Sequence, residues 1–240
     1  MIYGPNQLKT LVGKNNTPVS INEATNYPFS DEITFDVSTK SAVLFLWQLR
    51  IPAWCAKATI SINGKVTNSG KGGQLVSITH VWKDGDKVLL KMPMQVSTSN
   101  WGRNSRAVER GPLVYALKLG ENWVKGNDKY EGDYFSVLPT GNWNYGLSEQ
   151  VVADPVKTLQ VTEKPLAGKF VWNQQHSPIE ITAAGRQIPN WKLTDGVANQ
   201  PVTDRDGQYR GKVSDTVAQF TLIPYGFTKV RIVAFPVVKK

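Results

Sequence analysis

Residues 33–51 read ITFDVSTKSAVLFLWQLRI, and this stretch decides the fold class of the chain. Apolar side chains fall on its odd-numbered positions, namely Ile33, Phe35, Val37, Val43, Phe45, Trp47, Leu49 and Ile51. Because a β-strand turns successive side chains to opposite faces, each half of the stretch has an apolar face and a face that meets water. Two such apolar faces must pack together, which predicts stacked antiparallel sheets.

The same alternation continues to Leu117 and is divided by turn sequences. Asn63-Gly64 tolerates positive φ at both positions of a tight hairpin. Asp84-Gly85-Asp86 has turn chemistry as well, and it predicts a second hairpin between residues 75–82 and 87–94. Strand candidates in the second half of the chain are residues 135–138, 159–161, 170–172, 179–182, 217–223 and 229–238.

These patterns predict an all-β chain of two consecutive antiparallel β-sandwich domains, of the jelly-roll or immunoglobulin-like kind. The chain has 240 residues, which is long enough for two such domains. Residues 120–130 are polar and charged and are interpreted as a linker or long loop. We therefore place the domains at residues 1–118 and 119–240.

The formal charge of the chain is +9, from 28 Lys and Arg against 19 Asp and Glu. The lysines are spread over turns and outward-facing strand positions, such as Lys65, Lys83 and Lys91. Phosphate binding requires a clustered basic surface, so no nucleic-acid partner is expected. The longest apolar runs are far shorter than the roughly 20 residues that cross a bilayer, so no membrane partner is expected either.

Cys55 is the single cysteine, and the only histidines are His80 and His176. These residues are too few for an intrachain disulfide or a zinc cluster. Cys55 could act as a nucleophile, but no histidine is close to it in sequence, and a lone cysteine is most often a small buried side chain. We therefore predict no catalytic residue, no metal site and no cofactor in this chain.

Glycoside hydrolysis usually requires two carboxyl groups at a defined separation. Glu109, Glu149, Glu163 and Glu180 are candidates, but their spacing does not show that any two converge. The simpler interpretation is that they are solvated surface charges. Hydrolysis by this chain alone is therefore one of the hypotheses that stay open.

Tryptophans are the better functional lead, because the C–H face of a sugar ring stacks on an aromatic plane. Of eight tryptophans, Trp101, Trp123, Trp143 and Trp191 lie in turn-rich or linker-like contexts. They are the candidate carbohydrate-binding residues. The alternative interpretation is that they pack loops or contact a neighbouring domain.

Five segments in this order resemble a known family: TNYPF at 25–29, LRIPAW at 49–54, WKDGD at 82–86, ERGPLVY at 109–115 and LIPYG at 222–226. They are similar to the region after the catalytic barrel in glycoside hydrolase family 127, the β-L-arabinofuranosidase-like proteins. The resemblance covers nearly the whole chain: residues 1–118 resemble the middle β-sandwich of that family, and the remainder resembles its C-terminal β-sandwich.

The resemblance implies that the chemistry of the family lies outside these residues. Its catalytic machinery is an N-terminal (α/α)₆ barrel, in which three cysteines and a glutamate hold zinc beside a cysteine nucleophile, and none of these maps onto this sequence. We expect a non-catalytic accessory region that is inactive alone and braces the catalytic (α/α)₆ barrel of the parent polypeptide through an apolar patch near residues 3–11. The alternative is a carbohydrate-binding module, and a homo-oligomer is a further candidate assembly. Resemblance alone implies a periplasmic or extracellular location and a role in plant polysaccharide breakdown.

Overall fold

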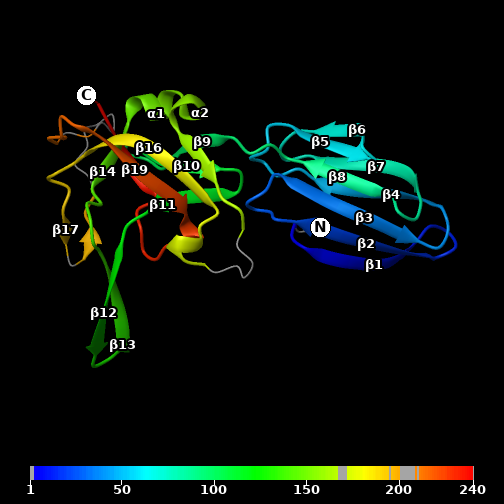
Figure 1. The fold of residues 1–240 in the computed structure, drawn as a ribbon, viewed down its shortest axis with the longest axis horizontal. Helices are drawn as coiled ribbons and strands as arrows, with labels where there is room; N and C mark the ends of the chain where they lie inside the picture. Colours follow the sequence, from blue (N-terminus) through cyan, green and yellow to red (C-terminus); the bar gives the residue numbers. More distant parts are fainter. Residues whose placement is uncertain (1–2, 167–171, 195, 201–208, 210, 240) are drawn as a thin grey trace. The chain divides into compact units, whose positions relative to one another are not determined.

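The computed structural model describes residues 3–166, 172–194, 196–200, 209 and 211–239 (Figure 1). The described residues are mainly β-strand, with two short α-helices, α1 (Glu149–Ala153) and α2 (Pro155–Thr158), and two 3-10 turns, η1 (Gln174–His176) and η2 (Tyr225–Phe227). The chain divides into two compact units, Met1–Met94 and Gln95–Lys240. The predicted all-β fold is confirmed.

The first unit consists of a six-stranded antiparallel sheet, in the order β1-β2-β3-β8-β5-β6, and a two-stranded sheet formed by β4 and β7. Its strands are β1 (Asn6–Val12), β2 (Thr17–Thr25), β3 (Glu32–Thr39), β4 (Val43–Arg50), β5 (Ala58–Ile62), β6 (Lys65–Gly70), β7 (Leu75–Trp82) and β8 (Lys87–Lys91). Side chains from both sheets form one buried cluster, so this unit is a sandwich.

The core of the first unit follows the alternation of residues 33–51. Phe35 of β3 is fully buried, and its ring lies 5.1 Å from that of Trp47 on β4, centroid to centroid. Trp82, at the end of β7, is also fully buried and lies 5.2 Å from Trp47. Its indole N–H donates to the carbonyl oxygen of Phe45 over 3.2 Å, so the large ring is buried with its polar atom satisfied.

One of the two predicted hairpins is confirmed and the other is wrong. Asn63 and Gly64 have φ of 50° and 81° and join β5 to β6, which pair with each other. By contrast, β7 pairs with β4, whereas β8 pairs with β3 and β5. The turn at Asp84-Gly85-Asp86 does form, but it carries the chain from one sheet to the other. Turn chemistry in the sequence specifies the bend and leaves the pairing of the flanking strands open.

The second unit pairs its strands in a circuit. The order β11-β19-β16-β14-β20-β10 returns to β11 through the β10–β11 pairing, β9 and β15 are added to β10 and β16, and the β14–β20 pairing is parallel. These strands are β9 (Val96–Asn100), β10 (Ser105–Arg110), β11 (Leu113–Leu117), β14 (Tyr145–Ser148), β15 (Gln160–Glu163), β16 (Ile179–Gln187), β19 (Val217–Pro224) and β20 (Ala234–Val238). Two separate hairpins, β12 (Glu121–Asp128) with β13 (Gly132–Pro139) and β17 (Leu193–Thr194) with β18 (Val197–Ala198), complete the unit.

The compact units divide the chain earlier than residue 118, where the sequence placed the boundary. Strands β9, β10 and β11 lie before that residue, yet β10 pairs with β20 and β11 pairs with β19 of the second unit. The polar residues 120–130, interpreted as a linker, form β12 and part of the turn of the hairpin β12–β13, which projects from the other strands of its unit (Figure 1). Of the strand candidate at 170–172, residues 170 and 171 lie outside the described residues. Within the described part of the chain, no helix has the length and apolar character needed to cross a membrane.

Candidate functional site

The outward face of β4 and β7 carries exposed aliphatic side chains. Leu44 and Val81 lie opposite each other in the strand register, and Leu46 follows on the same face of β4. Their exposed fractions are 59%, 46% and 56%, respectively. Because grouped exposed apolar side chains often mark contact surfaces, this β4–β7 outer face (Leu44, Leu46, Val81) is a candidate docking surface. Sequence reasoning missed it, although Leu44 and Leu46 already interrupt the alternation at even positions.

Two of the four predicted carbohydrate-binding tryptophans pack against each other. Trp191 is only 6% exposed, its ring lies edge-on at 5.1 Å from that of Trp143, and its indole N–H donates to the carbonyl oxygen of Asn199. This pair belongs to a small buried cluster of the second unit with Ile188. Such packing is what the alternative interpretation of these tryptophans described.

The other two predicted tryptophans are exposed. Trp101 follows β9 and is 68% exposed, and its indole N–H donates to the hydroxyl oxygen of Ser99 over 2.9 Å. Trp123, on β12, is 49% exposed. Both have aromatic surface that a ligand can reach.

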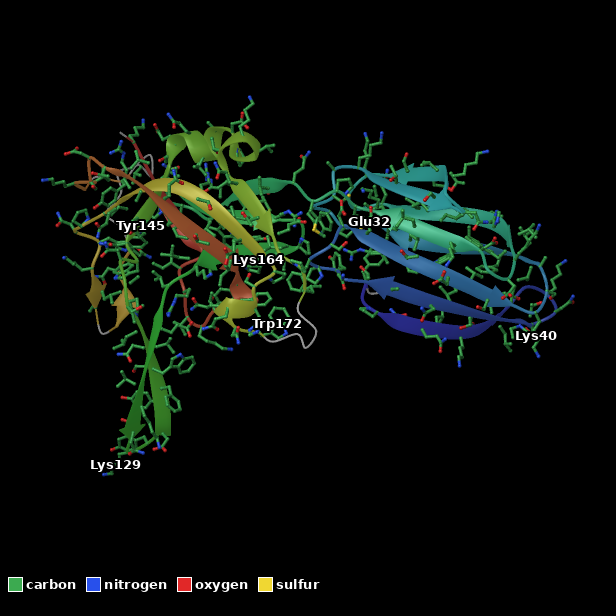
Figure 2. All side chains as sticks on the ribbon, viewed as in Figure 1. Glu32, Lys40, Lys129, Tyr145, Lys164 and Trp172 are labelled. Carbon is green, nitrogen blue, oxygen red and sulfur yellow. The ribbon has the colours of Figure 1, made fainter. Side chains whose placement is uncertain are left out.

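A pocket of about 350 Å³ opens at the base of the hairpin β12–β13. We call it the hairpin-base pocket. Trp123 and Trp172 contribute aromatic surface to it, and Glu121, Gln174 and Lys229 contribute polar groups. Trp172 is 53% exposed. It lies well away from Lys129 at the tip of the hairpin (Figure 2), so the pocket belongs to the base of the hairpin.

The Trp172 ring packs on the η2 turn, where it contacts Gly226 and Phe227. A β-carbon at Gly226 would lie 2.7 Å from the ring, so glycine is needed there for the close approach. The ring also packs on Phe227, with centroids 4.7 Å apart and planes tilted by 39°. Gly226 is the glycine of the segment LIPYG, and this contact gives that segment a structural role in the pocket.

Glu121 organises the polar side of the pocket. Its Oε2 accepts the indole N–H of Trp123 over 3.0 Å, and its Oε1 accepts Nε2 of Gln174 over 2.6 Å. The guanidinium of Arg231, whose side chain is 4% exposed, lies 3.7 Å from Oε1. Burial lowers the pKa of Arg231, and the charge of Glu121 opposes that shift. The carboxylate therefore orients one aromatic ring and one amide at the same time.

Sequence reasoning singled out Trp123 and missed the other members of this pocket. Trp172 was grouped with Phe170 and Val171 as a strand residue, and Glu121 was placed in a linker. The available signal was the pair Glu121 and Trp123, which share one face of a strand because they are two residues apart.

Each of the four carboxylates considered for hydrolysis is engaged by a different partner. Glu109 accepts from Ser99, Glu163 from Arg110, and Glu149 lies 3.5 Å from Lys239. Glu180 binds Lys118 at 2.7 Å and Lys164 at 2.8 Å. Burial alone would raise the pKa of Glu180, but the hydrogen bonds and charges of Lys118 and Lys164 lower it. These contacts support the interpretation as surface charges.

Cys55 is fully buried, and burial raises the pKa of its thiol, which is the opposite of what activates a nucleophile. Among the described residues, no group of three or more His, Cys, Asp and Glu side chains is arranged to hold a metal ion.

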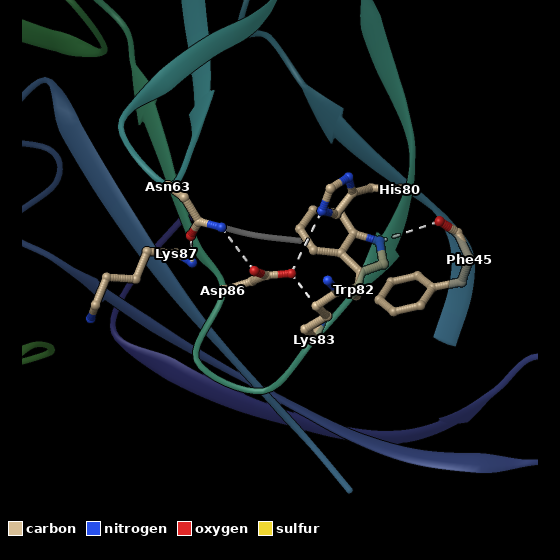
Figure 3. A network of polar contacts seen from close by, with 7 residues as sticks. All are labelled: Phe45, Asn63, His80, Trp82, Lys83, Asp86 and Lys87. Atoms are coloured by element: carbon tan, nitrogen blue, oxygen red, sulfur yellow. Dashed lines mark hydrogen bonds and ion pairs between the residues drawn. The ribbon is translucent and has the colours of Figure 1, made fainter. Parts of the chain in front are cut away.

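Asp86 is the centre of a polar network in the first unit (Figure 3). Its carboxylate accepts Nδ2 of Asn63 over 2.8 Å and the backbone N–H of Lys83 over 2.8 Å, and it lies 3.6 Å from Nε2 of His80. Burial alone would raise the pKa of Asp86, but these hydrogen bonds and the nearby positive charges lower it. All the partners belong to the turns and strands around the crossing between the sheets, so the network has a structural role.

The described residues form two β-units, with a candidate docking surface on the first and the hairpin-base pocket on the second. Residues 1–94 match the family model described as the middle domain of GH127 β-L-arabinofuranosidase. This range coincides with the first compact unit, and for these residues the predicted resemblance to family 127 is confirmed. No curated protein matches the sequence.

Solved structures extend the likeness in fold to the whole chain. A glycoside hydrolase and a GH127 β-L-arabinofuranosidase from Geobacillus stearothermophilus T6 each align with a TM-score of 0.63 and 22% identity over 99% and 100% of this chain. Another GH127 β-arabinofuranosidase aligns over 100% of it with a TM-score of 0.63 and 19% identity. The chain covers only 35%, 33% and 35% of these three proteins, so it spans about a third of their length.

Proposed function

We propose that this chain is a non-catalytic accessory region of a glycoside hydrolase of the β-L-arabinofuranosidase type, and that it braces a catalytic (α/α)₆ barrel. The observation that carries the proposal is the match of residues 1–94 to a middle domain of that family. A domain that lies in the middle of a longer polypeptide needs surfaces that contact its neighbours. Plant polysaccharide as the ultimate substrate and export from the cytoplasm are parts of the same proposal.

The first unit offers apolar surface for such a contact. The expected patch near residues 3–11 includes Leu8 and Leu11 of β1, which are 40% and 61% exposed. The β4–β7 outer face adds three more exposed aliphatic side chains. A β-carbon at Gly13, just after β1, would lie 3.1 Å from the side chain of Val43, so the end of β1 lies close to the buried side of the start of β4.

A chimera tests the bracing role. Residues 1–240 replace the corresponding third of the Geobacillus stearothermophilus enzyme, and the double variant Leu44→Asp with Leu46→Asp places two charges on the β4–β7 outer face. We expect the chimera to fold and hydrolyse an aryl β-L-arabinofuranoside, and the double variant to lower its melting temperature by at least about 4 °C, because a charge buried in an apolar contact is costly.

The matched control is Val66→Asp on β6, where the aliphatic side chain is 64% exposed and lies outside the β4–β7 outer face. This variant should leave the melting temperature unchanged. Bracing is refuted if both variants behave alike, or if deleting residues 1–240 alters neither stability nor activity. Release of nitrophenol by residues 1–240 alone would refute the non-catalytic assignment.

A second candidate function, a carbohydrate-binding module, is favoured by the exposed Trp123 at the hairpin-base pocket. Aromatic surface beside planar polar groups is the usual composition of a small-ligand pocket. The two functions use different surfaces, in different units, and do not exclude each other.

A further inference from the structure

We infer that the hairpin-base pocket binds a ring of a neutral oligosaccharide, with Trp123 and Trp172 as stacking surfaces and with Glu121 and Gln174 as partners for the sugar hydroxyls. The inference rests on the carbohydrate-binding alternative and is independent of the bracing role. The four tryptophans predicted from the sequence are dispersed, and only Trp123 of that set lies in this pocket. The other three proposed contact residues are Glu121, Trp172 and Gln174.

The composition of the pocket selects this chemical class. A sugar ring has apolar C–H faces and a rim of hydroxyl groups, so it matches aromatic side chains beside a carboxylate and amides. A purely apolar ligand would desolvate Glu121 and Gln174 without replacing their hydrogen bonds to water. The charged groups of the lining are one carboxylate, Glu121, and one ammonium, Lys229, so neither sign of charge dominates and the pocket favours a neutral ligand.

The stacking surfaces are oriented before a ligand arrives. The indole N–H of Trp123 is bound to Glu121, and the Trp172 ring lies over Gly226 and Phe227. Side chains that are already ordered lose little conformational entropy on binding. Two rings held in this way supply contact area at low cost.

The polar side retains hydrogen-bonding capacity. A carboxylate has about four acceptor positions, and Trp123 and Gln174 each use one of those of Glu121. The guanidinium of Arg231 lies 3.7 Å from Oε1 of Glu121, so a positive charge lies next to this half-buried carboxylate. Glu121 can therefore accept hydroxyl protons from a ligand while it continues to orient Trp123.

Calorimetric titration of the full chain with arabinotriose, xylotetraose and cellotetraose tests the inference. We expect binding to at least one of the three, and Trp123→Ala and Trp172→Ala should each weaken it about tenfold or more, because loss of one stacking surface has an effect of this size. Trp101→Ala is the matched control. It removes a tryptophan that is 68% exposed elsewhere in the same unit and should change the affinity less than twofold.

A third pocket variant, Gln174→Ala, separates loss of binding from loss of the folded structure. Trp172 packs on Phe227, so its replacement can disturb the fold, whereas Gln174→Ala removes only one amide and should still weaken binding several-fold. The inference is overturned by an absence of heat with all three oligosaccharides, or by binding that Trp101→Ala weakens as much as the pocket variants do. Neither result affects the chimera experiment, so the two proposals fail separately.

Discussion

The two units build β-structure by different pairing schemes. The first unit keeps its strands in two separate sheets around one buried cluster, and six of its eight strands alternate buried side chains with more exposed ones. The second closes a circuit that includes one parallel pairing, and places the hairpin β12–β13 and the η1 segment outside that circuit. The hairpin-base pocket is lined by residues of the hairpin and of the η1 segment, together with Phe227 and Lys229 at the η2 turn. Under the two proposals above, the regular unit supplies scaffold and contact faces, whereas the irregular unit supplies a place for a ligand.

The largest effect is expected from Trp82→Ala in the first unit. Trp82 is fully buried, contacts Trp47 and His80, and bonds to the carbonyl oxygen of Phe45. Loss of such a ring costs about 3–5 kcal/mol, which is a large part of the stability of a domain. If the units are separate cooperative bodies, hydrogen exchange measured by mass spectrometry should show lost protection in residues 1–94 only.

Trp101→Ala is the control, because a surface change of this kind alters stability by less than about 0.5 kcal/mol. Loss of protection in both units after Trp82→Ala would break the comparison and show that they unfold as one.

The counterpart in the second unit is Gly185→Ala. A β-carbon at Gly185 on β16 would lie 2.0 Å from the carbonyl oxygen of Gly146 on β14 and 2.8 Å from the ring of Phe220. Because backbone must move to make room, we expect a cost of about 1–3 kcal/mol. Reduced protection should be confined to residues 95–240 in the same exchange experiment.

Gly141→Ala is the matched control in the same unit, because its added β-carbon would have no neighbour within 4 Å. Equal effects of the two alanines would show that the close approach of β14 and β16 does not limit the packing of this unit.

Local structure could be predicted from the sequence far better than pairing. The alternation at residues 33–51 correctly indicated β3, β4 and their buried faces, because the period of a strand is a local property. The partner of a strand is decided by residues far away. For this reason the turn at residues 84–86 was taken for a hairpin, and β9–β11 were assigned to the first domain.

The candidate site shows the same division. The exposure of Trp101 and Trp123 follows from their local context, whereas Trp191 is buried because it packs against Trp143, 48 residues earlier in the chain. The role of Trp172 depends on Gly226 and Phe227, more than 50 residues later in the chain. Contacts at such a distance leave no local signal, so the pocket required the structure.

The smallest change in stability is expected from Asp86→Asn, at the turn that connects the two sheets of the first unit. This change depends on pH. The folded pKa of Asp86 is lower than that of the unfolded chain, so its charge stabilises the fold above the unfolded value and this contribution is lost as the pH falls through the folded value. Asp86→Asn should cost about 1–2 kcal/mol at pH 7, because an amide cannot replace both acceptor oxygens. Urea midpoints between about pH 2 and 7 should converge for the two proteins at the acid end, near and below the ordinary aspartate pKa of about 3.9.

Asp36→Asn, which removes an exposed ion pair with Lys87, is the control and should have little effect. A difference between wild type and Asp86→Asn that stays constant over the whole pH range would show that the network acts through shape alone, and that the charge of Asp86 does not stabilise the first unit.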